Sequence, residues 1–532
     1  MSKRTKTPSF ILELAIKVSP GQSKVIRSRF EAGRNLYNAL LSEAVKRLKA
    51  LRNSPEYQAA RATPKTPEYK EEKRAAFKEA RSQYGFTEYA LHAFATTART
   101  NWIAEHIDAN TAQTLATRAF RATDQVVFGK AKKVRFKSLG RGLDSLEGKS
   151  QKQGLRFVLE ENNGSLVWGK LVIPALIDWT DPVIYHALRE AGKIKYARLV
   201  SRKASSPRAE GADCTGQRYY VQLVIEGKSY QKLKNAPGNA VIGLDIGPST
   251  IAAVSQDGGE ARLELFCAEI MPDAKAKRRL QRKLDRQRRA GNPDNFDQKG
   301  RITRGKRLVW NNSHSYQITR RRLATTDRKL SAHRKSLQGA LANSLVRVGN
   351  VIKTEKVSYK GWQKLYGKSV GTRGPGMFVE KLKRTVARTG GTFLEFSTRT
   401  TKLSQLCHAC GSLTKKPLSQ RWHKCECGLG PVQRDLYSAW LASHINLETQ
   451  ILSATLKWEG VESRLMAVTD SLNQRAIAGE EFPQSMGLTR ARARLPESLL
   501  PTTAKNLVLN KVKAVSKDRT PRLKAWGWFR AE

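Results

Sequence analysis

The sequence is poor in acidic residues. Among its 532 residues, 46 Asp and Glu stand against 97 Lys and Arg, which leaves a formal net charge of +51. An excess of this size excludes an ordinary soluble enzyme. A strongly positive field attracts a polyanion, and each cation that neutralises a phosphate gains free energy from counterion release. We therefore expect nucleic acid as the partner.

Long apolar runs and cysteines are also scarce. No segment approaches the roughly 18 apolar residues that a membrane-spanning helix needs. The best early run, Phe10 to Val18, is interrupted by Glu13 and Lys17, so we expect neither a signal peptide nor a membrane anchor. Six cysteines in a chain this long exclude a disulfide scaffold, and four of them lie within 407–427. This clustering predicts a reducing compartment and a metal site.

The length predicts several domains, because a compact domain takes roughly 100 to 200 residues. Apolar residues alternate over 10–18, which predicts a strand. They then recur at three- and four-residue spacing, which predicts a helical bundle over 26–128. Further strand patterns occur at 155–159, 166–173, 197–201 and 219–225. These patterns predict a β-barrel, made of 1–25 and 129–236, that the bundle interrupts.

Three basic segments are candidate phosphate contacts. Residues 130–141 have no acid, and as a strand they would place Val134 and Phe136 opposite the cations Lys130, Lys132, Lys133, Arg135 and Lys137. A predicted helix at 274–290 has nine basic residues and one acid, Asp285, and its candidate contacts are Arg278, Arg279, Arg282, Lys283, Arg286 and Arg289. A second basic helix, 320–347, has a leucine stripe that we attribute to core packing and not to a dimerisation zipper.

Three acids stand in places where charge needs an explanation. Asp245 lies in the middle of the apolar strand pattern Val-Ile-Gly-Leu-Asp-Ile-Gly, where an unpaired carboxylate costs several kcal/mol. Glu355 ends another apolar strand pattern, and Asp435 lies near the start of a helix. Two Mg²⁺ ions a few Å apart require several convergent carboxylates. The three acids therefore predict a ribonuclease-H-like site, in which one metal activates water and the other stabilises the leaving oxygen.

The clustered cysteines form two pairs. Cys407 and Cys410 form a Cys-x-x-Cys, and Cys425 and Cys427 form a Cys-x-Cys, each pair followed by glycine. Paired thiolates after short turns suit a structural, tetrahedral Zn²⁺ site. We predict the four thiolates as the ligands. The short second pair leaves His408 or His423 as alternative ligands.

Together these features resemble the TnpB family of transposon-encoded nucleases, whose plan the compact type V CRISPR effectors share. The resemblance rests on Gly243-Leu244-Asp245-Ile246-Gly247, the arginine-rich helix, Glu355, and the cysteine pairs placed just before Arg434-Asp435. It implies an RNA-guided, Mg²⁺-dependent DNA endonuclease in which Asp245, Glu355 and Asp435 are the three RuvC acids. The implied partners are a guide RNA, double-stranded target DNA and its displaced single strand, in a prokaryotic cytoplasm and on the nucleoid when DNA is bound. The protein is expected to read backbone shape and a short flanking motif.

The resemblance also implies a multidomain α/β architecture. Its expected parts are a wedge barrel (1–25 and 129–236), a helical recognition domain (26–128), a RuvC-like nuclease (237–402 and 431–447), a zinc ribbon (403–430) and a carboxy-terminal extension (448–532). The extension is expected to be either an RNA-contacting segment or a largely disordered one. Tyr437 departs from the family pattern, because we expect a polar side chain beside the metals at that position.

Two other functions fit parts of the sequence. A guided repressor would bind DNA without cutting it, and the presence of all three acids argues against this function. A guide-independent nuclease acting on branched DNA would need the RuvC-like site alone. The basic helices and the inserted bundle exceed what such a nuclease needs.

Overall fold

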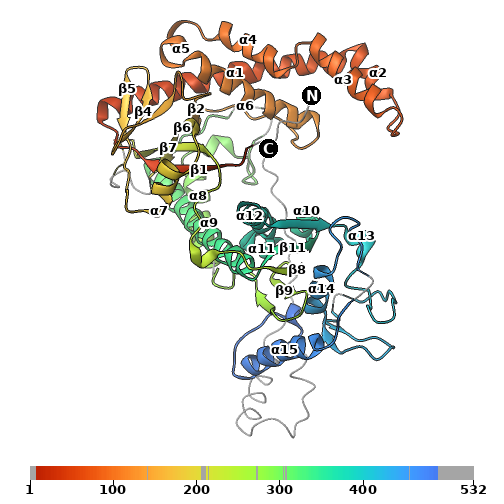
Figure 1. Cartoon of the computed structure of the whole chain (residues 1–532). Coiled ribbons are helices and arrows are strands. Elements are labelled where there is room, and N and C mark those ends of the chain that lie inside the picture. The colour runs from red at the N-terminus through yellow and green to blue at the C-terminus, as the bar shows by residue number, and fades with distance from the viewer. Residues whose placement is uncertain are drawn as a thin grey trace. The chain divides into compact units, whose positions relative to one another are not determined.

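The computed structural model describes residues 7–140, 142–204, 211, 213, 215–270, 273–303, 305, 308–417, 419–453 and 456–488, and of Lys368 the backbone alone. The chain forms two compact units, Met1–Gln231 and Lys232–Glu532. Figure 1 shows the elements of each unit in chain order. Among the helices in the described ranges, none is long and apolar enough to cross a membrane.

The first unit contains the helical bundle. Its helices are α1 (Pro20–Asn53), α2 (Pro55–Ala62), α3 (Lys70–Gln83), α4 (Glu88–Ala98), α5 (Asn101–His106) and α6 (Ala109–Val127). The sequence pattern predicts the start of the bundle at residue 26, whereas α1 begins at Pro20. Ser19 caps α1 through a reciprocal capping box with Gln22, and proline at the first helical position loses no hydrogen bond.

The strands of the first unit form two antiparallel sheets. The strands are β1 (Ser9–Ala15), β2 (Ser145–Glu147), β3 (Arg156–Leu159), β4 (Gly164–Trp168), β5 (Leu171–Pro174), β6 (Ile194–Lys203) and β7 (Gln217–Glu226). One sheet has the order β1-β7-β6-β2 and the other β3-β4-β5, and a bridge between Ile16 and Ala175 links them. A short helix, α7 (Pro182–Tyr185), and a π-helical turn (His186–Glu190) precede β6. Both sheets pack on one apolar core with α1, α4 and α6. A closed barrel stays a prediction.

The basic segment after α6 is not a strand. Residues 130–137 form no ladder, and the segment is held instead by side chains of α1. Asn38 donates to the carbonyl of Lys137 (2.9 Å) and accepts from its amide (2.8 Å). Val134 packs on the core, whereas Phe136 is 54% exposed. The predicted strand lacked a neighbour with which to pair, and the side-chain contacts of Asn38 satisfy the backbone there.

A mixed five-stranded sheet forms the centre of the second unit. Its strands are β8 (Ala240–Ile246), β9 (Thr250–Ser255), β10 (Ala261–Leu265), β11 (Gly349–Glu355) and β12 (Thr392–Phe396). Their order is β10-β9-β8-β11-β12, in which β9 runs antiparallel to both of its neighbours, β8 and β10, while β8, β11 and β12 pair in parallel. The central strand, β8, therefore pairs with an antiparallel neighbour on one side and a parallel one on the other.

Helices cover both faces of this sheet. On one face, α9 (His314–Val348) and α12 (Pro375–Arg388) bury Ile242, Leu244 and Ile246 of β8. On the other face, α14 (Arg434–Ser443) and α15 (Val461–Ile477) bury a second core with β9 and β10. Leu330, Leu337, Leu341 and Leu345 of α9 belong to the first of these cores, which confirms that the leucine stripe serves core packing.

The remaining elements of the second unit are short apart from α8 (Ala274–Ala290), which packs against α9. They are 3₁₀ turns at Leu233–Asn235, Pro293–Asn295 and Gln484–Met486, the helices α10 (Tyr359–Leu365), α11 (Gly367–Arg373) and α13 (Thr398–Thr401), and the two-residue strands β13 (Trp422–His423) and β14 (Val432–Gln433). Within the carboxy-terminal extension, residues 461–488 contribute Val461, Leu465, Met486 and Leu488 to the core around α14. This part of the extension is therefore folded onto the second unit. The remainder of the predicted extension, 489–532, lies outside the described residues.

Candidate active site and metal centre

Asp245 lies on the central strand of the sheet and faces α14. Side chains alternate between the two faces of a strand, and Leu244 and Ile246 point into the core formed with α9 and α12. Asp245 and Gly243 therefore belong to the opposite face. A methyl group on Gly243 would overlap the carbonyl oxygen of Ala439 and the amide nitrogen of Ser443. Glycine at this position thus lets the backbone of α14 lie directly on β8, which brings the start of α14 to Asp245.

Glu355 is the last residue of β11, the parallel neighbour of β8. Thr354 pairs with Leu244, so the register places Glu355 beside Asp245. Lys353, two residues earlier and on the same face as Glu355, is buried. Its Nζ donates to the carbonyl oxygens of Ser443 (2.8 Å) and Ile445 (2.5 Å), at the carboxyl end of α14. Lys353 therefore fixes α14 to the strand that carries Glu355.

Asp435 occupies the first turn of α14 and is 9% exposed. Gln433 caps this helix, because its side-chain oxygen accepts from the amide of Leu436 (2.8 Å). The guanidinium of Arg434 lies 3.5 Å from Asp435 and donates to the carbonyl oxygen of Gln420 (2.9 Å). The acid is thereby held between the helix and the segment that precedes β13.

The three acids act on one another electrostatically. Burial raises the pKa of Asp245 well above its usual value, and the charges of Asp435 and Glu355 raise it further. Burial likewise raises the pKa of Glu355 and that of Asp435. Arg434 and Arg421 oppose the shifts at Asp245 and Asp435 without reversing them. The charges of Asp435 and Glu355 thus act on a third carboxylate, Asp245, and carboxylate oxygens are the ligands that Mg²⁺ prefers.

The four clustered cysteines converge and could hold a metal ion. Their sulfurs all lie within 4.8 Å of one another, with 3.6 Å between the sulfurs of Cys407 and Cys427 and 3.5 Å between those of Cys410 and Cys425. A tetrahedral zinc ion with Zn–S bonds of about 2.3 Å separates its sulfurs by about 3.8 Å. Hydrogen bonds, first from the amide of Cys427, lower the pKa of the Cys425 thiol to about 6. Spacing and chemistry therefore fit Zn²⁺.

The two alternative histidine ligands lie elsewhere. The Nδ1 of His408 is 2.8 Å from the Tyr437 hydroxyl, which also accepts from the His408 amide (2.9 Å). The ring of His423 stacks on that of Tyr437, with 4.4 Å between centroids, and its Nδ1 lies 2.6 Å from the Nζ of Lys416. In the described residues, the cluster that could hold a metal comprises the four cysteines alone.

Tyr437 does not occupy the position that its place in the sequence suggested. It contacts the two histidines of the cysteine-bearing segment and packs beside Trp440 and Trp458. The expectation that Tyr437 stands beside the acids is wrong for a geometric reason. Residues two apart on a helix point to nearly opposite sides, so Asp435 and Tyr437 face different neighbours. Tyr437 instead joins α14 to the cysteine cluster.

The predicted nucleic-acid contacts are largely exposed. On α8 the six candidates Arg278, Arg279, Arg282, Lys283, Arg286 and Arg289 are all exposed, while Ala276, Leu280 and Leu284 are partly buried. Arg289 is paired with Asp285 (2.9 Å). In the segment after α6, Lys130, Lys132, Lys133 and Arg135 are exposed and Lys137 is partly buried.

Sequence reasoning missed Arg421 and Lys353. Arg421 is partly buried, and the charges of Asp435 and Asp245 act on its guanidinium. Lys353 carried a signal that could have been used, because it is the one cation inside an apolar strand pattern, Val-Ile-Lys-Thr-Glu. Arg421 carried no such signal, since it lies among other polar residues of a loop.

No family model matches the chain, and no curated protein matches it. Among solved structures, the cryo-EM structure of a Cas12f1–sgRNA–target DNA complex aligns with a TM-score of 0.43 and 12% identity, over 82% of this chain and 99% of that chain. The cryo-EM structure of a CRISPR–Cas12f ternary complex aligns with a TM-score of 0.25 and 13% identity, over 84% of this chain and all of that chain.

Proposed function

We propose that the protein is an RNA-guided DNA endonuclease of the TnpB kind, cutting through a RuvC-like, two-metal site. One observation carries the proposal. Asp245, Glu355 and Asp435 come from separate segments of the chain, and β8, β11 and α14 bring them to one buried place where their charges interact. Arg434 and Arg421 compensate this repulsion only in part, and a bound cation would compensate it further.

The acids would hold the two Mg²⁺ ions, which supply a metal-activated water and stabilisation of the leaving oxygen. The protein's own contribution is to fix the acids. Gly243 lets α14 pack directly on the sheet, and Lys353 donates to a carbonyl at the carboxyl end of α14. Arg434 and Gln433 fix the first turn of α14 through their hydrogen bonds. Arg421 adds a positive charge beside the acids, suited to the negative charge of a phosphodiester.

Nucleic-acid binding is supported by the net charge of +51 and by the exposed cations of α8. A helix with a cationic exposed side and an apolar side against α9 can lie along a phosphate backbone. The proposed partners are a guide RNA and target DNA, the RNA supplying sequence specificity by pairing. The proposed zinc ribbon would be structural, and the proposed compartment is the cytoplasm, with the protein on the nucleoid when DNA is bound.

A cleavage assay with matched variants tests the proposal. The protein is expressed with its flanking locus, purified with its RNA, and given matched supercoiled DNA with Mg²⁺ or EDTA. Cutting should require Mg²⁺ and should be lost in Asp245→Ala, with RNA binding retained. Asp257→Ala is the matched control, because Asp257 lies in the hairpin after β9 and bonds to Ser255 (2.5 Å) and Gly259 (3.0 Å).

Three results would contradict the proposal. Equal cutting by Asp245→Ala and the wild type would refute the assignment of the acids. Tight binding of matched DNA that stays intact in Mg²⁺ would indicate a guided repressor. Cutting of a four-way junction by RNA-free protein would indicate a guide-independent nuclease.

A further inference from the structure

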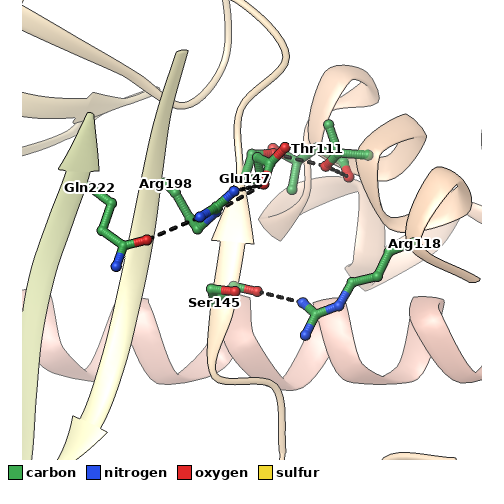
Figure 2. A network of polar contacts seen from close by, with 7 residues as sticks. Thr111, Arg118, Ser145, Glu147, Arg198 and Gln222 are labelled. Carbon is green, nitrogen blue, oxygen red and sulfur yellow. Dashed lines mark hydrogen bonds and ion pairs between the residues drawn. The ribbon is translucent and has the colours of Figure 1, made fainter. Parts of the chain in front are cut away.

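The first unit contains a cavity of about 920 Å³ that the proposed cleavage site does not use. Helices α4 and α6 line one side of it, and β2 and β6 line the other. Figure 2 shows part of its wall, where Arg118 donates to the carbonyl oxygen of Ser145 (3.2 Å) and Arg198 binds Glu147 (2.6 Å) and Gln222 (3.0 Å). These contacts hold two guanidinium groups in place at the junction of helix and sheet.

The wall is cationic. Its basic side chains are Arg118, Arg121, Lys137, Lys149 and Arg198, and its acids are Glu88 and Glu147. Both acids are already engaged, Glu147 by Arg198 and Glu88 by the hydroxyl of Thr117 (2.6 Å). Arg121 is exposed. An anion that enters the cavity therefore meets an excess of positive charge, with Arg121 at the solvent side.

Aromatic rings lie beside these cations. Tyr89 is 83% exposed although it lines the cavity, and its ring meets that of His92 edge-on at 5.9 Å between centroids. Tyr196 and Tyr37 line the same cavity, and the guanidinium of Arg118 lies 5.9 Å from the ring centroid of Tyr37. Tyr37 is buried and Tyr196 partly buried, so Tyr89 is the ring of this wall on which an unpaired base can stack.

The concave shape of the cavity favours an unpaired nucleotide over a duplex. A duplex groove is read by an element that protrudes into it, such as a helix or a two-stranded ribbon. A cavity in the protein receives a group that protrudes from the nucleic acid, and an unstacked nucleotide is such a group. The cavity also presents the amide of Gln125, which can pair with the edge of a base, whereas the amide oxygen of Gln113 already accepts from Lys149 (2.6 Å).

We propose that this cavity binds an unpaired nucleotide of RNA or of single-stranded DNA, with its phosphate near Arg121 and its base near Tyr89. The site extends the proposed function, because a guide RNA and a displaced DNA strand both supply unpaired nucleotides. It does not depend on the three acids of the second unit.

Photocrosslinking to the full-length chain tests the site. The probes are a 20-nucleotide RNA containing 4-thiouridine, a single-stranded DNA containing 4-thiothymidine, and the same DNA as a blunt duplex. Crosslinked peptides are mapped by mass spectrometry in RNA-free protein, at a salt concentration that suppresses non-specific contacts. We expect crosslinks in the peptides that contain Tyr89 or Tyr196, and the RNA and DNA arms show which strand the site prefers.

Two variants and two matched controls sharpen the test. Tyr89→Ala and Arg121→Glu should each lower the crosslink yield at Tyr196 by about 5-fold or more, the loss expected for one stacked base or one phosphate contact. Tyr69→Ala and Arg74→Glu change exposed residues of the same bundle that do not line the cavity, and should leave that yield unchanged.

The outcomes separate this site from the cleavage site. Unchanged crosslinks at Tyr196 in both variants, or crosslinks only outside the cavity, would overturn the proposal. Equal crosslinking by the duplex would show a duplex-binding face and also overturn it. Binding is measured in RNA-free protein without Mg²⁺. Absence of these crosslinks in the wild type, with cleavage intact, therefore refutes the cavity site alone, and wild-type crosslinks without cleavage refute the cleavage site alone.

Discussion

Neutralising one acid of the proposed metal site should stabilise the metal-free protein. Asp245 is flanked by Asp435 and Glu355, whose charges raise its pKa. Two unit charges about 5 to 10 Å apart repel by about 2 to 3 kcal/mol at an effective dielectric constant of about 20. Arg434 and Arg421 offset part of this repulsion. We expect Asp245→Asn, which keeps the shape of the side chain, to raise the free energy of unfolding in EDTA by about 1 to 2 kcal/mol.

Calorimetry measures the effect. For a unit of this size, 1 kcal/mol corresponds to about 2 to 4 °C, so the melting temperature of Asp245→Asn in EDTA should rise by about 2 to 8 °C. Mg²⁺ at about 100 times its Kd should stabilise the wild type by about 2.7 kcal/mol, and it should stabilise the variant much less. The variant and the wild type therefore exchange their order of stability when the metal is added.

Asp257→Asn is the control with the opposite sign. Hydrogen bonds from Ser255 and from the amide of Gly259 lower the pKa of Asp257. Its replacement should therefore reduce stability in EDTA and leave the response to Mg²⁺ unchanged. If Asp245→Asn instead lowers the melting temperature in EDTA and responds to Mg²⁺ as the wild type does, the carboxylate is a structural group and the reasoning fails.

Three further predictions concern other parts of the chain. Native mass spectrometry should find one zinc ion per chain in the wild type and in Cys267→Ser, which lies outside the cluster, and none in Cys407→Ser; full zinc in Cys407→Ser would contradict the assignment. Tyr437→Phe removes the acceptor of the His408 amide, so thermal unfolding should show a loss of about 1 to 3 kcal/mol, and an unchanged melting temperature would show that this bond is dispensable. Burial would raise the pKa of Asp213, but hydrogen bonds from Ser23, Gln217, Thr215 and Tyr219 lower it to about 2. A lowered pKa stabilises the fold above the ordinary carboxyl pKa of about 3.9, and the stabilisation is lost as pH falls towards 2. Asp213→Asn should therefore be less stable than the wild type by about 1 kcal/mol at pH 7, with the difference shrinking towards pH 2, and an equal difference at both pH values would exclude this origin.

The candidate site could be predicted from the sequence because a charged residue within an apolar strand pattern can be recognised without knowledge of the fold. Asp245 is conspicuous without any knowledge of its neighbours, and β8 forms where the apolar run predicted it. The cysteine pairs are equally local, since short turns fix each pair, and the four sulfurs meet in the structure. The exposed cations of α8 follow from periodicity, which sets the apolar stripe against α9 and leaves the other side free.

The features that could not be predicted from the sequence depend on contacts between distant segments of the chain. The interaction of Lys353 with the end of α14 joins residues about 90 positions apart, and no periodicity encodes it. The cations at 130–137 resemble a strand by alternation, but a strand needs a partner, and Asn38 of α1 takes that place. Tyr437 was placed by its distance in sequence from Asp435, whereas the helix turns the two side chains apart. The cavity of the first unit brings together α4, α6, β2 and β6, so composition alone could not predict it.

The measurement that tests the central claim most directly is cleavage of matched DNA by the protein purified with its own RNA. The RNA is sequenced, a DNA target complementary to its variable end is built, and cutting is followed with Mg²⁺ in the wild type, in Asp245→Ala and in Asp257→Ala. We predict a discrete bound RNA, Mg²⁺-dependent cutting by the wild type and Asp257→Ala, and none by Asp245→Ala. The absence of a discrete RNA, or equal cutting by Asp245→Ala, would contradict the proposed function.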